Sequence, residues 1–125
     1  NRDKLKELYE KYNLDKSDFF KHQHYTIITR QGIDKIQAAN DIKISYDLIY
    51  NSPDTKCIII KATATMGDQV IETYGEAAPA NNSNSYPVAM AEKRAMSRAC
   101  LKLCGFYQNN VFGEDEADAF KRSNN

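Results

Sequence analysis

Residues 86–105 read YPVAMAEKRAMSRACLKLCG, a stretch in which small residues and cations alternate. Pro87 favours the first turn of a helix, and Gly105 is typical of the residue that ends one. At 100° per residue the small and apolar side chains share one broad arc, which contains Val88, Ala91, Ala95, Met96, Ala99 and Leu103. The stretch therefore predicts one long helix whose alanines let it pack closely on a sheet.

Cations occupy a second stripe of the same helix. Arg94, Arg98 and Lys102 recur at i, i+4 and i+8 beside the alanines, whereas Lys93 lies on a different face. Cations spaced roughly 6 Å apart along a helix match the spacing of successive phosphates in a nucleic acid. The stripe predicts an anion-binding surface, and a solvated basic face is the alternative.

The rest of the chain supplies strands for this helix to cover. Gly67-Asp68 predicts a two-residue hairpin turn between two strands. Periodicity predicts short helices over residues 3–13 and 33–40, and strands over 25–29, 42–50, 57–65 and 70–74. The expected fold class is α+β, with an antiparallel β-meander of three to four strands backed by one long C-terminal helix. This is a β-β-β-α core with a short N-terminal helix.

Tyrosines accompany the predicted strands, in a chain with eight Tyr, five Phe and no Trp. Tyr46 and Tyr50 fall on the apolar side of the alternating strand 42–50, so we assign both to the core. Tyr25 and Tyr74 stay open as aromatic faces on which bases could stack, with a packing role as the alternative.

Length and composition predict one domain. The chain has 125 residues and 42% hydrophobic content, which fits a modest single core over residues 1–106 followed by a polar, acidic tail over 107–125. There is no apolar run of membrane-spanning length and no signal-peptide pattern, and the three cysteines form no disulfide framework. We therefore expect a cytoplasmic protein without a membrane partner. The missing initiator Met predicts a fragment of a longer chain.

Acidic and basic residues are unevenly distributed along the chain, although the formal net charge is zero. Four of the 17 acidic residues lie in 113–118, and two of the 17 basic residues lie beyond them. Residues 1–112 therefore carry 15 basic and 13 acidic groups, a net charge of +2. Such a balance argues against nucleic-acid binding by bulk charge alone. The acidic run reads as a solvated tail, or as a segment ending at Phe120 that contacts a partner protein or competes with DNA for the cations.

The stretch Ala91-Glu92-Lys93-Arg94-Ala95-Met96-Ser97-Arg98-Ala99, closed by Gly105, resembles the helix signature of the single-strand annealing superfamily. That group contains the eukaryotic Rad-fifty-two recombination mediator and phage annealing proteins of the Sak type. Their helix reads Ala-Glu-Thr-Asp-Ala-x-Lys-Arg-Ala, and the hairpin closing on Gly75-Glu76-Ala77 is also similar. Ser97 stands in place of the usual Lys, and Lys93-Arg94 replaces Thr-Asp.

The resemblance implies a β-β-β-α core, a ring or filament of identical chains, and single-stranded DNA in a basic groove. It places the family's helix arginine at Arg98 and a further helix cation at Lys102. The function that the resemblance implies is single-stranded DNA binding and annealing in phage-type recombination or repair, in bacteria or in a phage-infected host, without an enzymatic step or a cofactor. The predicted nucleic-acid-binding residues are Arg94, Arg98, Lys102, Lys93, Lys61, Arg30, Tyr74 and Tyr25.

Other readings of the sequence stay open. A protein-interaction or structural module without nucleic-acid binding is the main alternative, and a small enzyme is a weaker one because no catalytic arrangement stands out. His22 and His24, together with Cys100 and Cys104 one helical turn apart, form a less favoured zinc set. Burial of the two cysteines as small hydrophobes is the favoured reading of that pair.

Overall fold

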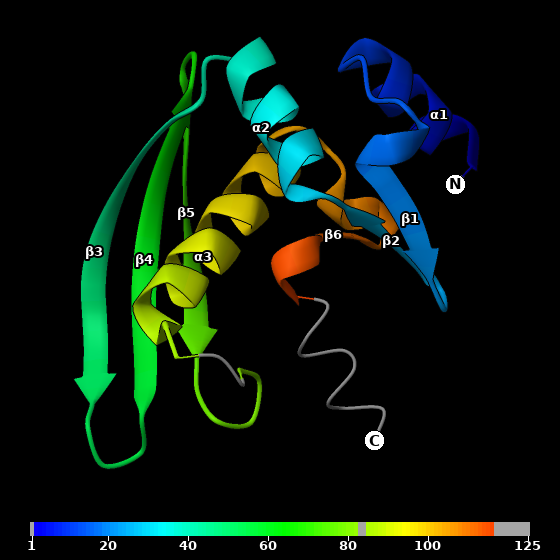
Figure 1. The fold of residues 1–125 in the computed structure, drawn as a ribbon. Coiled ribbons are helices and arrows are strands. Elements are labelled where there is room, and N and C mark those ends of the chain that lie inside the picture. Colours follow the sequence, from blue (N-terminus) through cyan, green and yellow to red (C-terminus); the bar gives the residue numbers. More distant parts are fainter. Residues whose placement is uncertain (1, 83–84, 117–125) are drawn as a thin grey trace.

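The computed structural model describes residues 2–82 and 85–116, and Figure 1 shows their arrangement. The helices are α1 (Arg2–Lys11), α2 (Arg30–Ala39) and α3 (Pro87–Leu103). The strands are β1 (Phe19–His22), β2 (Tyr25–Ile28), β3 (Lys43–Ser52), β4 (Cys57–Met66), β5 (Gln69–Ala77) and β6 (Val111–Gly113). Short 3-10 helices cover Lys16–Asp18, Tyr107–Asn109 and Glu114–Glu116. In this part of the chain no helix combines the length and apolar character needed to cross a membrane.

The larger sheet is the predicted meander. Its strands follow the order β3-β4-β5 with antiparallel pairing throughout, and Met66 and Gln69 flank the turn at Gly67 and Asp68. Helix α3 crosses one face of β4 and β5 (Figure 1). The α+β fold class and the β-β-β-α core are therefore confirmed.

Close contact between α3 and β5 depends on small residues. A Cβ built on Gly75 would lie 2.0 Å from the backbone oxygen of Ala91 and 2.6 Å from the backbone nitrogen of Ala95. The Thr73 hydroxyl donates a hydrogen bond of 2.7 Å to the Ala95 oxygen. The helix backbone thus rests almost directly on the strand, as the alanine spacing predicts.

The ends of α3 also follow the sequence. Pro87 is its first residue, and the chain leaves the helix through Cys104 into Gly105, whose φ is +84°. That left-handed conformation favours glycine because a Cβ would be strained there.

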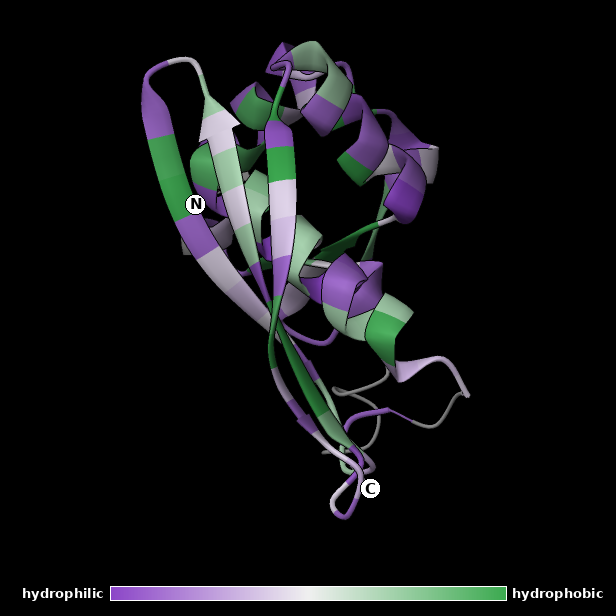
Figure 2. Ribbon diagram, turned by 90° about the vertical axis from the view of Figure 1, so that its left-hand side faces the viewer, coloured by the Kyte–Doolittle hydropathy of each residue, from purple (hydrophilic) through white to green (hydrophobic). Residues whose placement is uncertain are grey.

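Strand β3 corrects the prediction that Tyr46 and Tyr50 are core residues. Tyr46 is 37% exposed and Tyr50 is 47% exposed. The strand lies at the edge of the sheet, and α3 packs over β4 and β5 instead. A bulge between Leu48 and Tyr50 also shifts the register, so Tyr46 lies opposite Ala62 whereas Tyr50 lies opposite Ile59, on the other face. Figure 2, which views the molecule from the side of β3, shows apolar residues on this outer strand.

A second, smaller sheet was not predicted. Its order is β1-β2-β6, with β1 antiparallel and β6 parallel to β2. The chain stays packed through Glu116, past the boundary at residue 106 that the composition favoured, because Val111 is fully buried and Glu116 is nearly so. A Cβ on Gly113 would lie 2.8 Å from the Ser97 Cβ, so the start of the predicted tail lies directly on α3.

Candidate nucleic-acid interface

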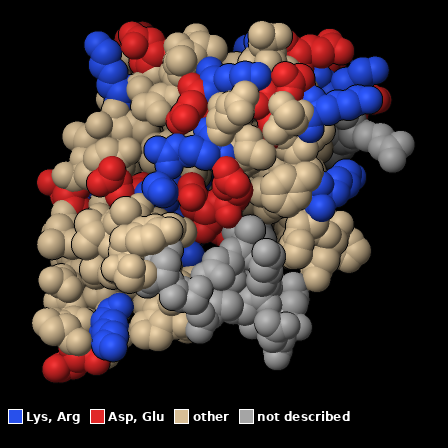
Figure 3. Space-filling view, in the orientation of Figure 1, with Lys and Arg blue, Asp and Glu red and all other residues tan. Residues whose placement is uncertain are grey.

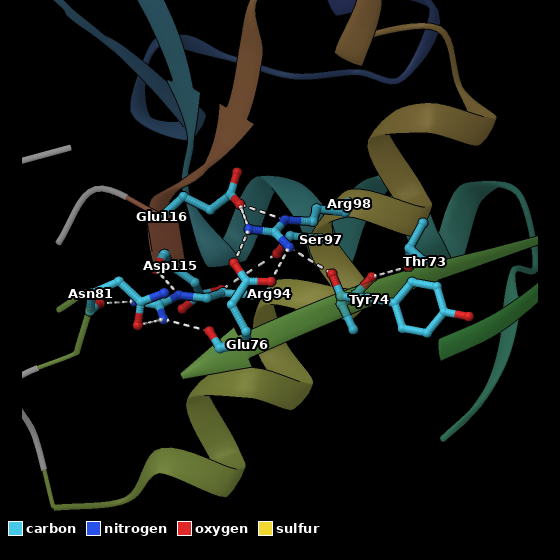
Figure 4. A network of polar contacts seen from close by, with 10 residues as sticks. Thr73, Tyr74, Glu76, Asn81, Arg94, Ser97, Arg98, Asp115 and Glu116 are labelled. Atoms are coloured by element: carbon cyan, nitrogen blue, oxygen red, sulfur yellow. Dashed lines mark hydrogen bonds and ion pairs between the residues drawn. The ribbon is translucent and has the colours of Figure 1, made fainter. Parts of the chain in front are cut away.

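Arg94, the first cation of the predicted stripe, is buried, with 1% of its surface exposed. Its guanidinium donates to the backbone oxygens of Asp115 at 3.0 Å, Glu76 at 2.9 Å and Asn81 at 2.6 Å, and to the Asn81 side-chain oxygen at 3.1 Å. Figure 4 shows these contacts converging from β5, the loop after it and the segment after β6. Arg94 therefore joins three separate parts of the fold.

Arg98, one turn further along α3, is surrounded by acceptors. Its guanidinium donates to the Tyr74 backbone oxygen at 2.6 Å and to both carboxylate oxygens of Glu76, at 3.1 and 3.2 Å. It also forms an ion pair with Glu116 (Figure 4). Burial lowers the pKa of Arg98, but Glu76 and Glu116 outweigh that effect and raise it above its ordinary value. Burial raises the pKa of Glu116, and Arg98 partly offsets this rise.

The two arginines act together on one edge of the large sheet. Tyr74 and Glu76 are two residues apart on β5, and their backbone oxygens accept from Arg98 and Arg94 respectively. In Figure 3 the centre of this face shows basic and acidic side chains in contact, not a uniform basic surface. A role of either arginine in DNA binding stays a prediction, and the structure gives both of them partners within the protein.

Lys102 differs from the two arginines because it is exposed and makes no ion pair within the described part of the chain. Its Nζ lies 5.1 Å from the centre of the Tyr107 ring, a cation–π contact. Tyr107 and Tyr25 each make a T-shaped contact with Phe112, in both cases with the ring centres 5.3 Å apart. We call Tyr25, Phe112 and Tyr107 the aromatic row.

The aromatic row connects two predicted site residues, Lys102 and Tyr25, that are 77 positions apart in the sequence. All three rings are partly exposed. Tyr107 and Phe112 were not among the predicted site residues, because residues after 106 were assigned to an acidic tail. The recurrence of aromatic residues at 106, 107 and 112 among apolar neighbours was the signal that could have identified them.

Lys61 and Tyr74 are also brought together, on the face of the large sheet opposite α3. They are direct cross-strand partners on β4 and β5. The Lys61 ammonium forms a 3.1 Å ion pair with Glu72, and the hydrogen bond that it donates to the Glu72 carboxylate raises the pKa of Lys61. Tyr74 is 49% exposed. This pair is a second, partly neutralised aromatic and cationic surface.

The remaining two predicted cations lie beside the segment after β6. Arg30 begins α2, where its Nε lies 3.3 Å from an Asp34 carboxylate oxygen and its backbone N–H donates to the Glu114 side chain. The Lys93 Nζ lies 5.9 Å from the centre of the exposed Tyr86 ring. Burial raises the pKa of Asp115, and the charges of Arg30 and Lys93 both partly offset this rise. Both cations therefore border the same segment as Arg94, whereas Lys61 and Tyr74 lie on the opposite face of the large sheet.

The alternative zinc set is not assembled. His22 and His24 belong to the β1–β2 hairpin, whereas Cys100 and Cys104 are buried beneath α2 and α1 in the core. Burial raises the pKa of Cys100 to about 12. Among the residues that the structure describes, no group of three or more His, Cys, Asp or Glu side chains could hold a metal ion.

Comparisons of the chain with protein-family models, with curated proteins and with solved structures found no significant match.

Proposed function

We propose that the chain binds single-stranded DNA and promotes the annealing of complementary strands, as an assembly of identical copies. The observation that carries this proposal is the Lys102 ammonium beside the aromatic row. Single-stranded nucleic acid is commonly held by cations that contact phosphates and by aromatic rings on which bases stack. The confirmed β-β-β-α core, whose helix carries the quoted signature, supports the same function.

The proposed mechanism needs no covalent step. Lys102 contacts a phosphate, and the exposed edges and faces of Tyr107 and Tyr25 contact bases. The Watson–Crick edges of neighbouring bases then stay available for a complementary strand. Arg94 and Arg98 contribute indirectly, because they hold β5 and the 113–116 segment against α3 and so fix Tyr107 and Phe112 in place.

Assembly of several copies is part of the proposal. Strand β3 pairs with β4 alone among the described strands, and it exposes Tyr46, Leu48 and Ile49. Long, apolar edge strands tend to pair with another chain. At the other edge of the sheet, the arginine contacts already occupy two β5 carbonyls. The β3 side is therefore the expected contact between copies.

A protein-interaction module without DNA binding is the second candidate. The exposed apolar residues on β3 favour it, as does the internal pairing of Arg94 and Arg98. Partners of such a module would bind the β3 side without any dependence on Lys102.

Fluorescence anisotropy of a labelled oligo-dT at several salt concentrations separates the two candidates. The parent should bind, with an affinity that falls as salt rises, because each phosphate contact releases counterions. Lys102→Ala should reduce the slope of log K against log salt by about 0.7, the value for one phosphate contact to a single strand. Lys11→Ala is the matched control, because Lys11 is also exposed and lies 5.3 Å from the centre of a tyrosine ring, that of Tyr12, and it should leave the slope unchanged. Absence of binding by the parent would reject the proposed function.

A further inference from the structure

A cleft lies between α1, the 3-10 helix Lys16–Asp18 and β1, and none of the residues that line it is a predicted site residue. Its volume is about 560 Å³. Phe19 and Tyr9 form part of its wall and stack on each other with their ring centres 4.1 Å apart. Clefts of 300–1,000 Å³ with an apolar lining and a few polar groups are typical of ligand sites.

Three lysines surround the cleft, each from a different element. Lys6 comes from α1, Lys16 from the 3-10 helix and Lys21 from β1, and all three are exposed. No ion pair involves any of them within the described residues. Asp3 is the one acidic residue in the lining.

The acids next to Lys16 in sequence are directed elsewhere. Asp15 and Asp18 lie 3.6 and 2.7 Å from the Lys35 ammonium, and Asp18 is fully buried. The Asp15 side chain also accepts hydrogen bonds from the Ser17 hydroxyl and from the Ser17 backbone N–H, and these two bonds lower the pKa of Asp15. Both carboxylates are thus engaged with Lys35 and the local backbone, which leaves the charge of Lys16 available at the cleft.

Phe20 supplies an aromatic surface at the same place. It lines the cleft from β1 and is 45% exposed, which is unusual for a phenylalanine. An exposed aromatic ring beside lysines that form no ion pair suits a ligand with several negative charges and with flat groups that can stack on the ring. An acidic peptide would pair with the charges of the lysines but would have no flat group to stack on the Phe20 ring.

We propose that this cleft is a further contact for single-stranded DNA, in which Phe20 stacks on a base and Lys6, Lys16 and Lys21 contact the flanking phosphates. The inference rests on the proposed function, and it adds a surface that none of the sequence-predicted residues occupies. Thr26 lines the cleft whereas its neighbour Tyr25 belongs to the aromatic row. Phe20 lies opposite Ile27 and Ile27 lies opposite Phe112, so the Phe20 ring is on the face of the small sheet that carries the aromatic row, whereas Lys21 and Thr26 are on the other face. Phe20 therefore lies at the edge of the cleft, on the side of the aromatic row.

The chain has no tryptophan, so Phe20→Trp introduces a single fluorescent reporter into the cleft. Oligo-dT should quench its emission over the same concentration range in which anisotropy reports binding. Val70→Trp, at a 60% exposed position on β5, is the matched control and should show no quenching. Phe20→Ala should weaken oligo-dT binding by about fivefold to 150-fold, the loss expected for one stacked base.

Replacement of Lys6, Lys16 and Lys21 by Gln should reduce the salt slope by about 2, the sum of three single-strand phosphate contacts. If Phe20→Trp binds oligo-dT by anisotropy but its emission does not change, the cleft proposal is overturned while the proposed function stands. If the parent fails to bind oligo-dT at all, both fall. Quenching by polyglutamate and not by oligo-dT would also overturn the proposal, in favour of an acidic protein segment.

Discussion

The Arg94 guanidinium donates a 2.9 Å hydrogen bond to the backbone oxygen of Glu76. A cation of the basic helix α3 therefore binds β5, the strand on which the helix packs. The same side chain contacts both Asn81 and Asp115. Arg98 repeats the arrangement one turn later with Tyr74 and Glu116. The stripe is therefore mainly a structural junction, and its exposed end is Lys102.

Removal of the Arg94 side chain should destabilise the fold strongly. Arg94→Ala leaves several buried backbone oxygens without a donor, and hydrogen bonds from a charged group contribute about 1.5–3 kcal/mol each. We expect the free energy of unfolding to fall by about 3 kcal/mol or more, measured by urea denaturation. Arg94→Lys should not restore it, because a lysine cannot reproduce the planar set of donors.

Lys102→Ala is the matched control for Arg94. The exposed lysine should change the free energy of unfolding by no more than about 0.5 kcal/mol. Equal urea midpoints for Arg94→Ala and the parent would show that the network around Arg94 does not stabilise the protein.

Gly75→Ala tests the close contact between α3 and β5. Its Cβ would lie within 2.0 Å of the Ala91 backbone oxygen, so the helix would have to move away from the strand. Overpacking of this kind costs about 3 kcal/mol, and thermal unfolding followed by circular dichroism would measure the loss. Gly67→Ala has open space but a φ of +59°, so it should cost only about 1–2 kcal/mol. A smaller loss for Gly75→Ala than for Gly67→Ala would contradict the packing described above.

The stability of the protein should fall at alkaline pH. Burial raises the pKa of Cys100 from 9.0 to about 12 and contributes most to raising that of Tyr12 from 10.0 to about 12. Both groups are neutral acids in the folded state, so above pH 9–10 they ionise first in the unfolded chain. Each then lowers the free energy of unfolding as pH rises, by up to about 1.4 kcal/mol per pH unit, until the folded group also ionises near pH 12.

Urea denaturation at several values between pH 8 and pH 11 would measure this dependence, and Cys100→Ala should make it shallower. A free energy of unfolding that stays constant or rises over this range would disagree with the burial of both groups.

Leu48→Asp tests the expected contact between copies. Leu48 is 59% exposed on β3, so the substitution should leave the monomer folded but place a charge in any interface on that strand. Light scattering should show a homo-oligomer for the parent and a smaller species for the variant. Val70→Asp, at an exposed position on β5, is the control and should assemble like the parent. A parent that remains a monomer of about 14 kDa at high concentration would argue against assembly.

The helix α3 and the hairpin at Gly67 were predictable because both depend on local spacing. Alanines at every fourth position and a glycine at the turn specify geometry within a few residues. The partners of Arg94 were not predictable in this way, since Glu76, Asn81 and Asp115 come from three separate segments. A helix period shows that a cation lies beside the alanines but not whether another segment covers it.

Strands β3 and β6 show two further limits of sequence patterns. In β3 the alternation of apolar residues suggested burial, but only the arrangement of α3 over β4 and β5 determines which strand is covered. The bulge after Leu48 then moved Tyr50 to the opposite face. Strand β6 has three residues beside an acidic run, too few to produce a period-2 signal. Tyr107 and Phe112 were not predicted because the acidic run led to the assignment of all residues after 106 to a polar tail.

The proposed annealing activity can be measured by the kinetics of strand pairing. Two complementary oligonucleotides, one with a fluorophore and one with a quencher, are mixed with and without the protein, and the loss of fluorescence gives the annealing rate. We predict that the parent accelerates annealing, that the double variant Lys102→Ala/Tyr107→Ala loses most of this acceleration, and that Lys11→Ala retains it. A parent that anneals the strands no faster than they anneal alone would contradict the account.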